Sequence, residues 1–171
     1  PDSESAAAGA ACAEKDALFR EMARTLLGAE DREDLYRRVI RMAAGVSRSR
    51  RASIMLVNPE HTGLTLQAAL GWEPDETVRR TLFPLDGCLS GSVVREGKRM
   101  LVSDIKAVTG RDNRSGYSSS SFIILPFAEN GRVIGVINLT ERADSDLYEY
   151  DELELLNHLL DLLALVLLRV E

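Results

Sequence analysis

The sequence predicts a single α+β domain in which helices lie on the faces of an antiparallel sheet. Two segments, 51–72 and 121–142, have apolar runs on both sides of turn residues, as in β-hairpins. Helical periodicity occurs near both ends of the chain and in short segments between the hairpins. The runs "SIMLV" and "FIILPF" are apolar on consecutive residues, so the sheet is expected to be covered on both sides. A chain of 171 residues is long enough to bury a core of its own.

The N-terminal part is predicted to contain a tail and two helices. Residues 1–13 are small and polar and are expected to form a flexible tail, with the domain spanning 14–171. A first helix starts at about Glu14 and ends near Gly28, and its apolar face consists of Leu18, Met22 and Leu26. Asp31 is a good N-cap for a second helix that ends at Gly45, with an apolar face of Leu35, Val39 and Met42.

The first hairpin pairs 51–58 with 63–72, and Asn58-Pro59 supplies the turn signal. Pro74 follows at what is expected to be the first position of a short helix, whose apolar residues are Val78 and Leu82.

The second half of the chain begins with a glycine-rich turn and a short helix that Gly97 ends. A strand at 98–105 and a polar loop at 106–116 come next. The second hairpin turns at Asn130-Gly131, the pair most favoured in two-residue hairpin turns. One long helix is predicted at 147–170.

Composition excludes several classes of function. The net charge of −6 gives no general attraction to nucleic acid or to an anionic membrane, and no apolar span is long enough for membrane insertion. Two cysteines are too few for a disulfide scaffold or a four-cysteine zinc site. The chain has no secretory signal, so a reducing cytoplasmic setting is expected. It begins without methionine, so we expect it to be a piece excised from a longer protein.

The stretch "LDGCLSGSVVREGKRMLVSD" (85–104) is the place to look for catalysis. A phosphate-binding loop needs G-x-x-x-x-G-K-[ST] before a helix, but here Arg99 follows Gly97-Lys98 and a strand comes next. G-x-S-x-G is absent, and no histidine lies near Cys88 to activate its thiol, so Cys88 is interpreted as a small core residue. We therefore expect no enzyme activity. The glycines instead allow a short helix to pack closely on a sheet and to border a cavity.

The last helix has an apolar pattern that predicts self-association. Residues at alternating steps of three and four form one stripe, and a second stripe lies beside it. One stripe suffices to cover the sheet, and a large leftover apolar patch is rare on a soluble monomer. A homodimer through the terminal helices is predicted, with the interface residues Leu18, Met22, Leu153, Leu156, Leu160, Leu163 and Leu167. The alternatives are that the leftover stripe contacts the chain's own first helix or a following domain.

Three segments together resemble the GAF domain family. "GCLSGSVVREGKRMLVSDI" is similar to its glycine-punctuated helix and following strand, "GYSSSSFIILPFAENGRVIGVINL" to its serine-rich strand entry and Asn-Leu strand, and "LYEYDELELLNHLLDLLALVL" to its closing helix. The likeness extends from about Ala17 to Val170. It implies a sheet of about six antiparallel strands, with the N- and C-terminal helices on one face. Short helices and loops would form a small-molecule pocket on the other face.

The resemblance also implies a function: the sensor domain of a bacterial signalling or transcription-regulatory protein. Such a domain relays its state through the C-terminal helix to an attached output domain. The predicted ligand-binding residues are Trp72, Ser90, Ser92, Asp104, Tyr117, Ser118, Ser120 and Phe122. Two alternatives remain open: the serines cap helices and turns, and the domain is a ligand-free dimerisation and relay module.

Departures from the family patterns narrow the choice of ligand. Asn138, Asp151 and Glu152 match a cyclic-nucleotide set, but Leu139 and Leu147 replace its lysine and phenylalanine. The cysteine-histidine pair that attaches bilins is absent. Neither histidine is placed to ligate haem, since one lies in a hairpin turn and the other in the long helix. Cys88 is displaced from the position of the cysteines in free-methionine-sulfoxide reductases of the family, so an enzyme similar to these reductases is kept only as a remote alternative. The ligand and any cofactor are therefore unassigned, and no metal site is predicted.

Overall fold

The computed structural model describes residues 2–110, 121–143 and 148–170, with side chains from residue 13 onward. The elements are, in chain order, α1 (Asp2–Leu27), α2 (Arg32–Ser47), β1 (Ser49–Val57), β2 (Gly63–Leu70), α3 (Glu76–Arg80), β3 (Leu82–Pro84), α4 (Leu89–Glu96), β4 (Met100–Val102), α5 (Ile105–Thr109), β5 (Phe122–Glu129), β6 (Arg132–Arg142) and α6 (Tyr150–Leu167). Within these residues no helix combines the length and the apolar character that a membrane crossing requires.

The described residues form a six-stranded sheet in the order β3-β2-β1-β6-β5-β4, which confirms the predicted fold class. Every pairing along it is antiparallel. The two predicted hairpins are β1–β2 and β5–β6, and they meet where β1 pairs with β6 at the centre of the sheet. Asn130 and Gly131 both have positive φ, 49° and 80°, as a two-residue type I′ turn requires.

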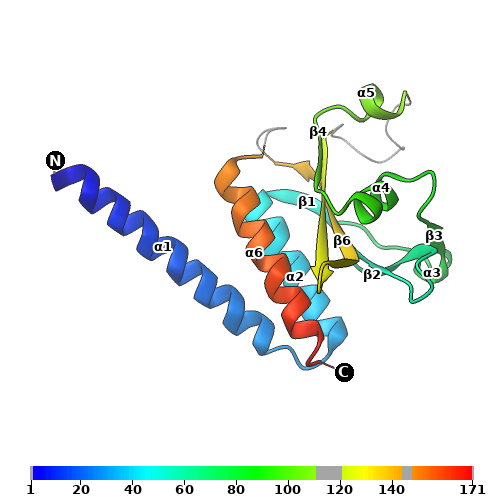
Figure 1. The fold of residues 1–171 in the computed structure, drawn as a ribbon, viewed down its shortest axis with the longest axis horizontal. Helices are drawn as coiled ribbons and strands as arrows, with labels where there is room; N and C mark the ends of the chain where they lie inside the picture. Colours follow the sequence, from blue (N-terminus) through cyan, green and yellow to red (C-terminus); the bar gives the residue numbers. More distant parts are fainter. Residues whose placement is uncertain (1, 111–120, 144–147, 171) are drawn as a thin grey trace.

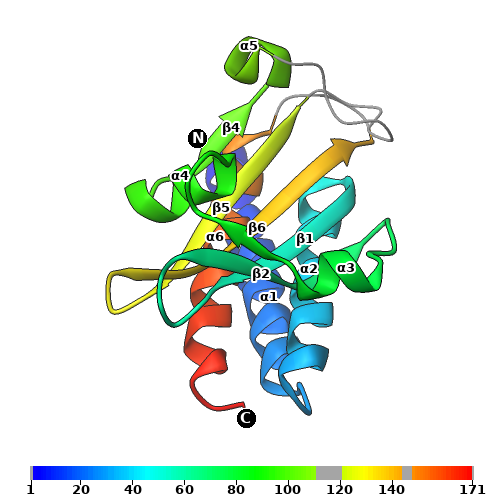
Figure 2. The same ribbon diagram turned by 90° about the vertical axis from the view of Figure 1, so that its right-hand side faces the viewer.

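Helices lie on both sides of this sheet (Figure 1). α2 and α6 pack against one face, and α1 lies on their outer side; it runs in the same direction as α6 (Figures 1 and 2). The core on this side is built from β-strand residues such as Ile54 and Ile137 together with Leu35 and Leu156, all fully buried. The sheet is therefore covered directly by α2 and α6, and α1 reaches the core through Met22 and Leu26.

Several predicted boundaries differ from the observed ones. α1 starts at Asp2 rather than near Glu14, so the segment predicted as a flexible tail is helical. Asp31 caps α2 as predicted, through its Oδ1 and the Asp34 N–H, but the helix continues past Gly45 to Ser47 because an exposed glycine alone does not stop a helix. α5 occupies the start of the predicted loop 106–116, whose remainder from 111 lies outside the described residues.

The short helix after Pro74 also differs. Asp75 is its N-cap, so α3 begins at Glu76, and Leu82 belongs to β3 instead of the helix. The carboxylate of Asp75 accepts a hydrogen bond from the Val78 N–H at 2.8 Å, which satisfies one of the free amides of the first turn.

The other face of the sheet is covered by α4. Val93 of α4 and Leu85 pack against Ile124, Val136 and Leu64 in a second, smaller apolar cluster. Gly91 is needed for this approach, because a Cβ there would overlap the carbonyl oxygen of Leu85. Gly97 ends α4 with a φ of 64° and an N–H bond to the Val93 carbonyl, as the sequence predicts.

A buried ion pair joins the end of β6 to the start of α6. Arg142 donates to both carboxylate oxygens of Glu152, with Nη1–Oε2 at 2.6 Å and Nη2–Oε1 at 2.9 Å. The same carboxylate accepts from the Glu149 N–H at 2.9 Å and so closes a capping box on α6. Arg142 also lies 5.2 Å from the centre of the Tyr148 ring. The direction in which α6 leaves the sheet is therefore fixed by one guanidinium.

Two glycine substitutions should change stability in opposite directions. Gly91→Ala places a methyl group against a backbone carbonyl that cannot move aside, and we expect the free energy of unfolding to fall by about 1–3 kcal/mol. Gly45→Ala is the matched control: Gly45 is an exposed residue within α2, and no neighbouring atom would meet an added methyl group there. At this position the gain in helix propensity should raise stability by about 0.5–1 kcal/mol. Urea denaturation measures both, and equal effects at the two sites would contradict the close packing of α4.

The Arg142–Glu152 pair should be costly to break. Arg142→Ala leaves a buried carboxylate without its partner, so we expect a loss of about 3–5 kcal/mol in the free energy of unfolding. Arg80→Ala breaks the exposed Arg80–Glu76 pair of α3 and should cost no more than about 0.5 kcal/mol. Comparable losses in the two variants would show that the pair does not tie the sheet to α6.

The same pair sets an acid dependence of stability. Burial alone would raise the pKa of Glu152, but the hydrogen bonds from Arg142 and Glu149 and the charges of Arg142 and Arg48 outweigh it, so the pKa lies below its ordinary value of 4.5. The unfolded chain then binds the proton more readily, and the stabilisation is present above pH 4.5 and lost as pH falls through the folded pKa. Relative to Glu152→Gln, the stability advantage of the native chain in urea should shrink steadily below about pH 4.5.

Candidate functional site

The face of the sheet beneath α4 carries a chain of hydrogen bonds that joins three elements. Ser90 Oγ, on α4, donates to Asn138 Oδ1 of β6 over 3.0 Å. Asn138 Nδ2 donates in turn to Ser53 Oγ of β1 over 3.1 Å. All three side chains are half-buried. One amide thus ties the covering helix to the two central strands.

The position of this amide follows from strand alternation. Asn138 and Ser53 are directly opposed in the β1–β6 ladder, and their neighbours Ile137 and Ile54 point to the other face and are fully buried. A single polar residue within the apolar runs "VIGVINL" and "ASIMLV" is the signal that marks both positions in the sequence. Neither was among the predicted ligand residues, most of which come from loops and from the glycine-rich segment.

Aromatic and basic groups lie next to the amide. Thr140, two residues further along β6, is paired with Phe122 of β5 and with Arg51 of β1. The guanidinium carbon of Arg51 lies 6.0 Å from the centre of the Trp72 ring, within the range of a cation–π contact. β2 ends at Leu70, so Trp72 lies just beyond the strand. Trp72, Ser90 and Phe122 are the predicted residues that lie on this face.

Two further predicted ligand residues have other partners. Ser92 lies two positions after Ser90 on α4, on nearly the opposite side of the helix, and its Oγ accepts from Arg95 at 3.3 Å. Asp104 is exposed and caps α5, accepting from the Lys106 N–H at 2.9 Å. Tyr117, Ser118 and Ser120 lie outside the described residues. A binding role for these five residues stays a prediction.

The residues predicted for a dimer interface lie mostly inside the chain. All except Leu18 are buried, at 0–8% exposure. In the second stripe of α6, Leu159 and Val166 are also buried, while Leu155 and Leu162 are half-buried and pack against the same core. The homodimer stays a prediction. Among the residues whose side chains the structure describes, the exposed large apolar ones on α1, on α6 and at the C-cap of α6 are Leu18, Phe19, Leu27, Tyr150, Leu165 and Leu168.

Cys88 is a helix cap instead of a core residue. It is half-exposed at the N-terminus of α4, where its sulfur accepts from the Gly91 N–H and donates to the Pro84 carbonyl, both at 3.2 Å. Cys12 belongs to α1, across the sheet from α4 (Figure 1). Within the part of the chain that the structure describes, no group of three or more His, Cys, Asp and Glu side chains is placed to hold a metal ion.

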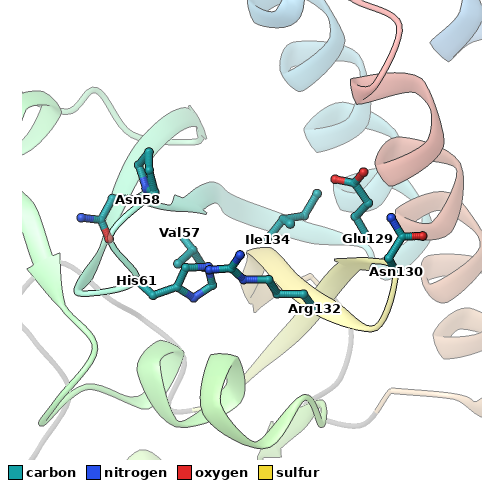
Figure 3. A pocket seen from close by; sticks show the side chains of 8 residues that line it. Val57, Asn58, His61, Glu129, Asn130, Arg132 and Ile134 are labelled. Atoms are coloured by element: carbon teal, nitrogen blue, oxygen red, sulfur yellow. The ribbon is translucent and has the colours of Figure 1, made fainter.

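An open pocket lies at another edge of the sheet (Figure 3). It has a volume of about 610 Å³ and lies between the β1–β2 turn, with Asn58 and His61, and the β5–β6 turn, with Glu129 and Arg132. A smaller pocket of about 200 Å³ adjoins it and shares Val57, Glu129 and Ile134. Neither contains a predicted ligand residue.

Comparison with known proteins agrees with this architecture. The model of the GAF domain family matches residues 29–167. The GAF domain of an Acinetobacter phosphoenolpyruvate-protein phosphotransferase has a similar structure, with 17% identity, a TM-score of 0.78, and coverage of 91% of this chain and 93% of that one. A segment of a methyl-accepting chemotaxis protein, residues 122 to 287, gives 20% identity, a TM-score of 0.71, and coverage of 86% and 95%.

An enzyme is also among the similar structures. The reduced form of fRMsr from Staphylococcus aureus gives 17% identity and a TM-score of 0.64, with coverage of 87% of this chain and 94% of that one. No curated protein sequence matches the chain. These identities establish a shared fold, while the family model covers most of the sequence. The chain belongs to the GAF domain family.

Proposed function

We propose that this domain is a regulatory sensor, which binds a small polar molecule on the sheet face beneath α4 and passes its state to α6. GAF domains are commonly sensory or regulatory parts of signalling proteins, and the similar structures come partly from such proteins. The observation that carries the proposal is the Ser90–Asn138–Ser53 chain. Half-buried hydroxyl and amide groups, arranged between a sheet and a covering helix, suit the recognition of a ligand with several hydrogen-bonding groups.

The side chains next to the Ser90–Asn138–Ser53 hydrogen bonds indicate which ligands would fit this face. Trp72 and Phe122 offer aromatic surface, and the Arg51 side chain lies beside the Trp72 ring. A planar or apolar body could rest on these groups while its polar atoms replace the Ser90–Asn138 bond. Such an exchange costs little, because one hydrogen bond is made as another is broken.

β6 supplies the route from this face to α6. Asn138 lies in the strand, and Arg142 follows four residues later, about 13 Å along an extended chain. Arg142 holds Glu152 in the first turn of α6. A shift of β6 that accompanies ligand binding would therefore move the N-terminus of α6. In the full-length protein, α6 would carry this movement to an attached output domain.

A ligand-free relay module is the second candidate. The apolar cluster of Val93, Leu85, Ile124, Val136 and Leu64 fills space beneath α4, and the two pockets described above lie elsewhere. In this alternative the sheet and α6 transmit a signal that arises in a neighbouring domain, and Asn138 serves only to satisfy the polar groups of the sheet.

A regulatory role is favoured over catalysis of the kind that an fRMsr-like enzyme would perform. The Cys88 sulfur is engaged as the cap of α4, with the Gly91 N–H and the Pro84 carbonyl as its partners. Using it as a nucleophile would remove the cap.

The sensor proposal is tested by a thermal-shift screen with nucleobases, amino acids, sugars and short organic acids. A true ligand present at about 100 times its Kd stabilises the fold by about 2.7 kcal/mol and raises Tm accordingly. Asn138→Ala and Ser90→Ala should reduce that shift, because each removes a group of the hydrogen-bond chain. Ser92→Ala is the matched control and should keep the full shift, since Ser92 contacts Arg95 on the other side of α4.

Hydrogen exchange measures whether ligand binding is transmitted to α6. The ligand should change exchange in the first turn of α6, and Arg142→Lys should weaken this change while leaving the affinity unaltered, because Lys cannot form the bidentate contact. A screen without a single stabilising compound would favour the ligand-free module. If a compound gives the same thermal shift in Asn138→Ala as in Ser92→Ala, it binds outside this face.

A further inference from the structure

The open pocket of Figure 3 lies at the end of the sheet where both hairpins turn. Its volume of about 610 Å³ is in the range of small-molecule sites. Val57 of β1, Pro59 of the first turn and Ile134 of β6 give it apolar walls, and its basic groups are His61 and Arg132. The pocket therefore combines apolar surface with two basic side chains.

The two basic side chains approach each other across this pocket. Arg132, the first residue of β6, extends from the second hairpin toward the His61 ring of the first (Figure 3). Among the residues that the structure describes, neither side chain has a carboxylate partner. An anion bound between them would accept hydrogen bonds from both and would offset the repulsion between a guanidinium and a protonated imidazole.

The first turn holds His61 in place without a ligand. The Asn58 side-chain oxygen accepts from the Thr62 and Gly63 N–H groups, both at 2.9 Å, and the His61 N–H donates to the Asn58 carbonyl at 2.9 Å. His61 has a φ of 55°, in the left-handed region that is unfavourable for a residue with a side chain. Because these hydrogen bonds fix the turn, the imidazole is preorganised, which lowers the entropic cost of binding.

One acidic group also lines the pocket, at the side away from His61. Glu129 ends β5, and its side chain extends toward the long helices (Figure 3). Glu129 also lines the smaller pocket together with Arg32, so a cation is available to its carboxylate on that side. The positive end of the open pocket is therefore the end that His61 and Arg132 form.

We propose that this pocket binds a phosphate monoester of a small organic molecule. The Arg132 guanidinium donates to two phosphate oxygens, and the His61 imidazole donates to the third. The organic part packs against Val57, Pro59 and Ile134. A monoester carries about 1.5–2 negative charges at neutral pH, so it suits a pair of basic groups better than a carboxylate does. The apolar walls favour an ester over inorganic phosphate.

This site is separate from the face beneath α4, and it does not depend on the sensor function proposed there. An occupant would connect the turns of the two hairpins, whose strands β1 and β6 already pair. The adjoining smaller pocket is lined by Leu167 and Leu168, so binding would stabilise the end of the sheet that lies next to the end of α6.

Calorimetric titration with phenyl phosphate, inorganic phosphate, benzoate and phenol tests the proposal. Phenyl phosphate should bind about tenfold more tightly than each of the others, which lack the apolar body, the second charge and any charge, respectively. Arg132→Gln should weaken phenyl phosphate binding about tenfold. His61→Gly should also weaken it, and glycine adopts the left-handed backbone of this turn without strain.

Matched controls separate the pocket from general charge effects. Arg80→Gln removes an exposed arginine that pairs with Glu76 on α3, and His158→Gln removes an imidazole that contacts Phe19; both should bind as the native chain does. Glu129→Gln should instead tighten binding, because it removes the one negative charge that lines the pocket. Amide NMR shifts caused by phenyl phosphate should be largest at 57–63 and 129–134.

Several results would overturn the proposal. One is the absence of phenyl phosphate binding at about 10 mM, a concentration that detects Kd values in the millimolar range. Equal affinity of Arg132→Gln and Arg80→Gln is another, and so is inorganic phosphate binding as tightly as the ester. If Asn138→Ala weakens binding as much as Arg132→Gln does, the anion binds beneath α4 and not here, a result that leaves the sensor proposal standing.

Discussion

The bidentate contact between Arg142 and Glu152 is the interaction on which the arrangement of this domain depends. It lies where the last strand of the sheet ends and the last helix begins, and both of its side chains are nearly or fully buried. The carboxylate also closes the capping box of α6, so one group sets the end of the strand, the start of the helix and the angle between them. Because α6 covers the centre of the sheet, the position of the core follows from this contact. Taking two charged side chains out of water is costly, so a buried ion pair adds little net stability. The main contribution of this pair is therefore to fix the direction of α6 relative to the sheet.

The amino-acid sequence predicts most of this fold from local chemistry. The Asn130-Gly131 turn, the Asp31 cap and the Gly97 helix end all occur where their residue types require them. The errors have identifiable causes. The helix at 2–13 has no amphipathic pattern, but the segment is rich in alanine, and this strong helix propensity was given too little weight. α2 extends two residues beyond Gly45, where Ser47 is fully buried.

The candidate sites were harder to predict than the fold. Trp72, Ser90 and Phe122 were expected on the ligand face because they flank the glycine-rich helix or a strand end. Asn138 and Ser53 were not predicted, although each is a single polar residue in an apolar strand. Their importance depends on register, which places two residues 85 positions apart directly opposite each other. The two open pockets at the edge of the sheet have no signature in the sequence, since their walls come from elements far apart along the chain.

The pairing of β1 with β6 has a consequence for the way the chain folds. The two hairpins are local and can form within microseconds, but the ladder between them joins residues such as Ser53 and Asn138, so a loop of 85 residues must close before the centre of the sheet exists. Until that closure, β1 and β6 each present an unpaired edge rich in Val, Ile and Leu. During synthesis on a ribosome, β1 must therefore wait for β6 to emerge, and the domain passes through its most aggregation-prone stage just before it is complete.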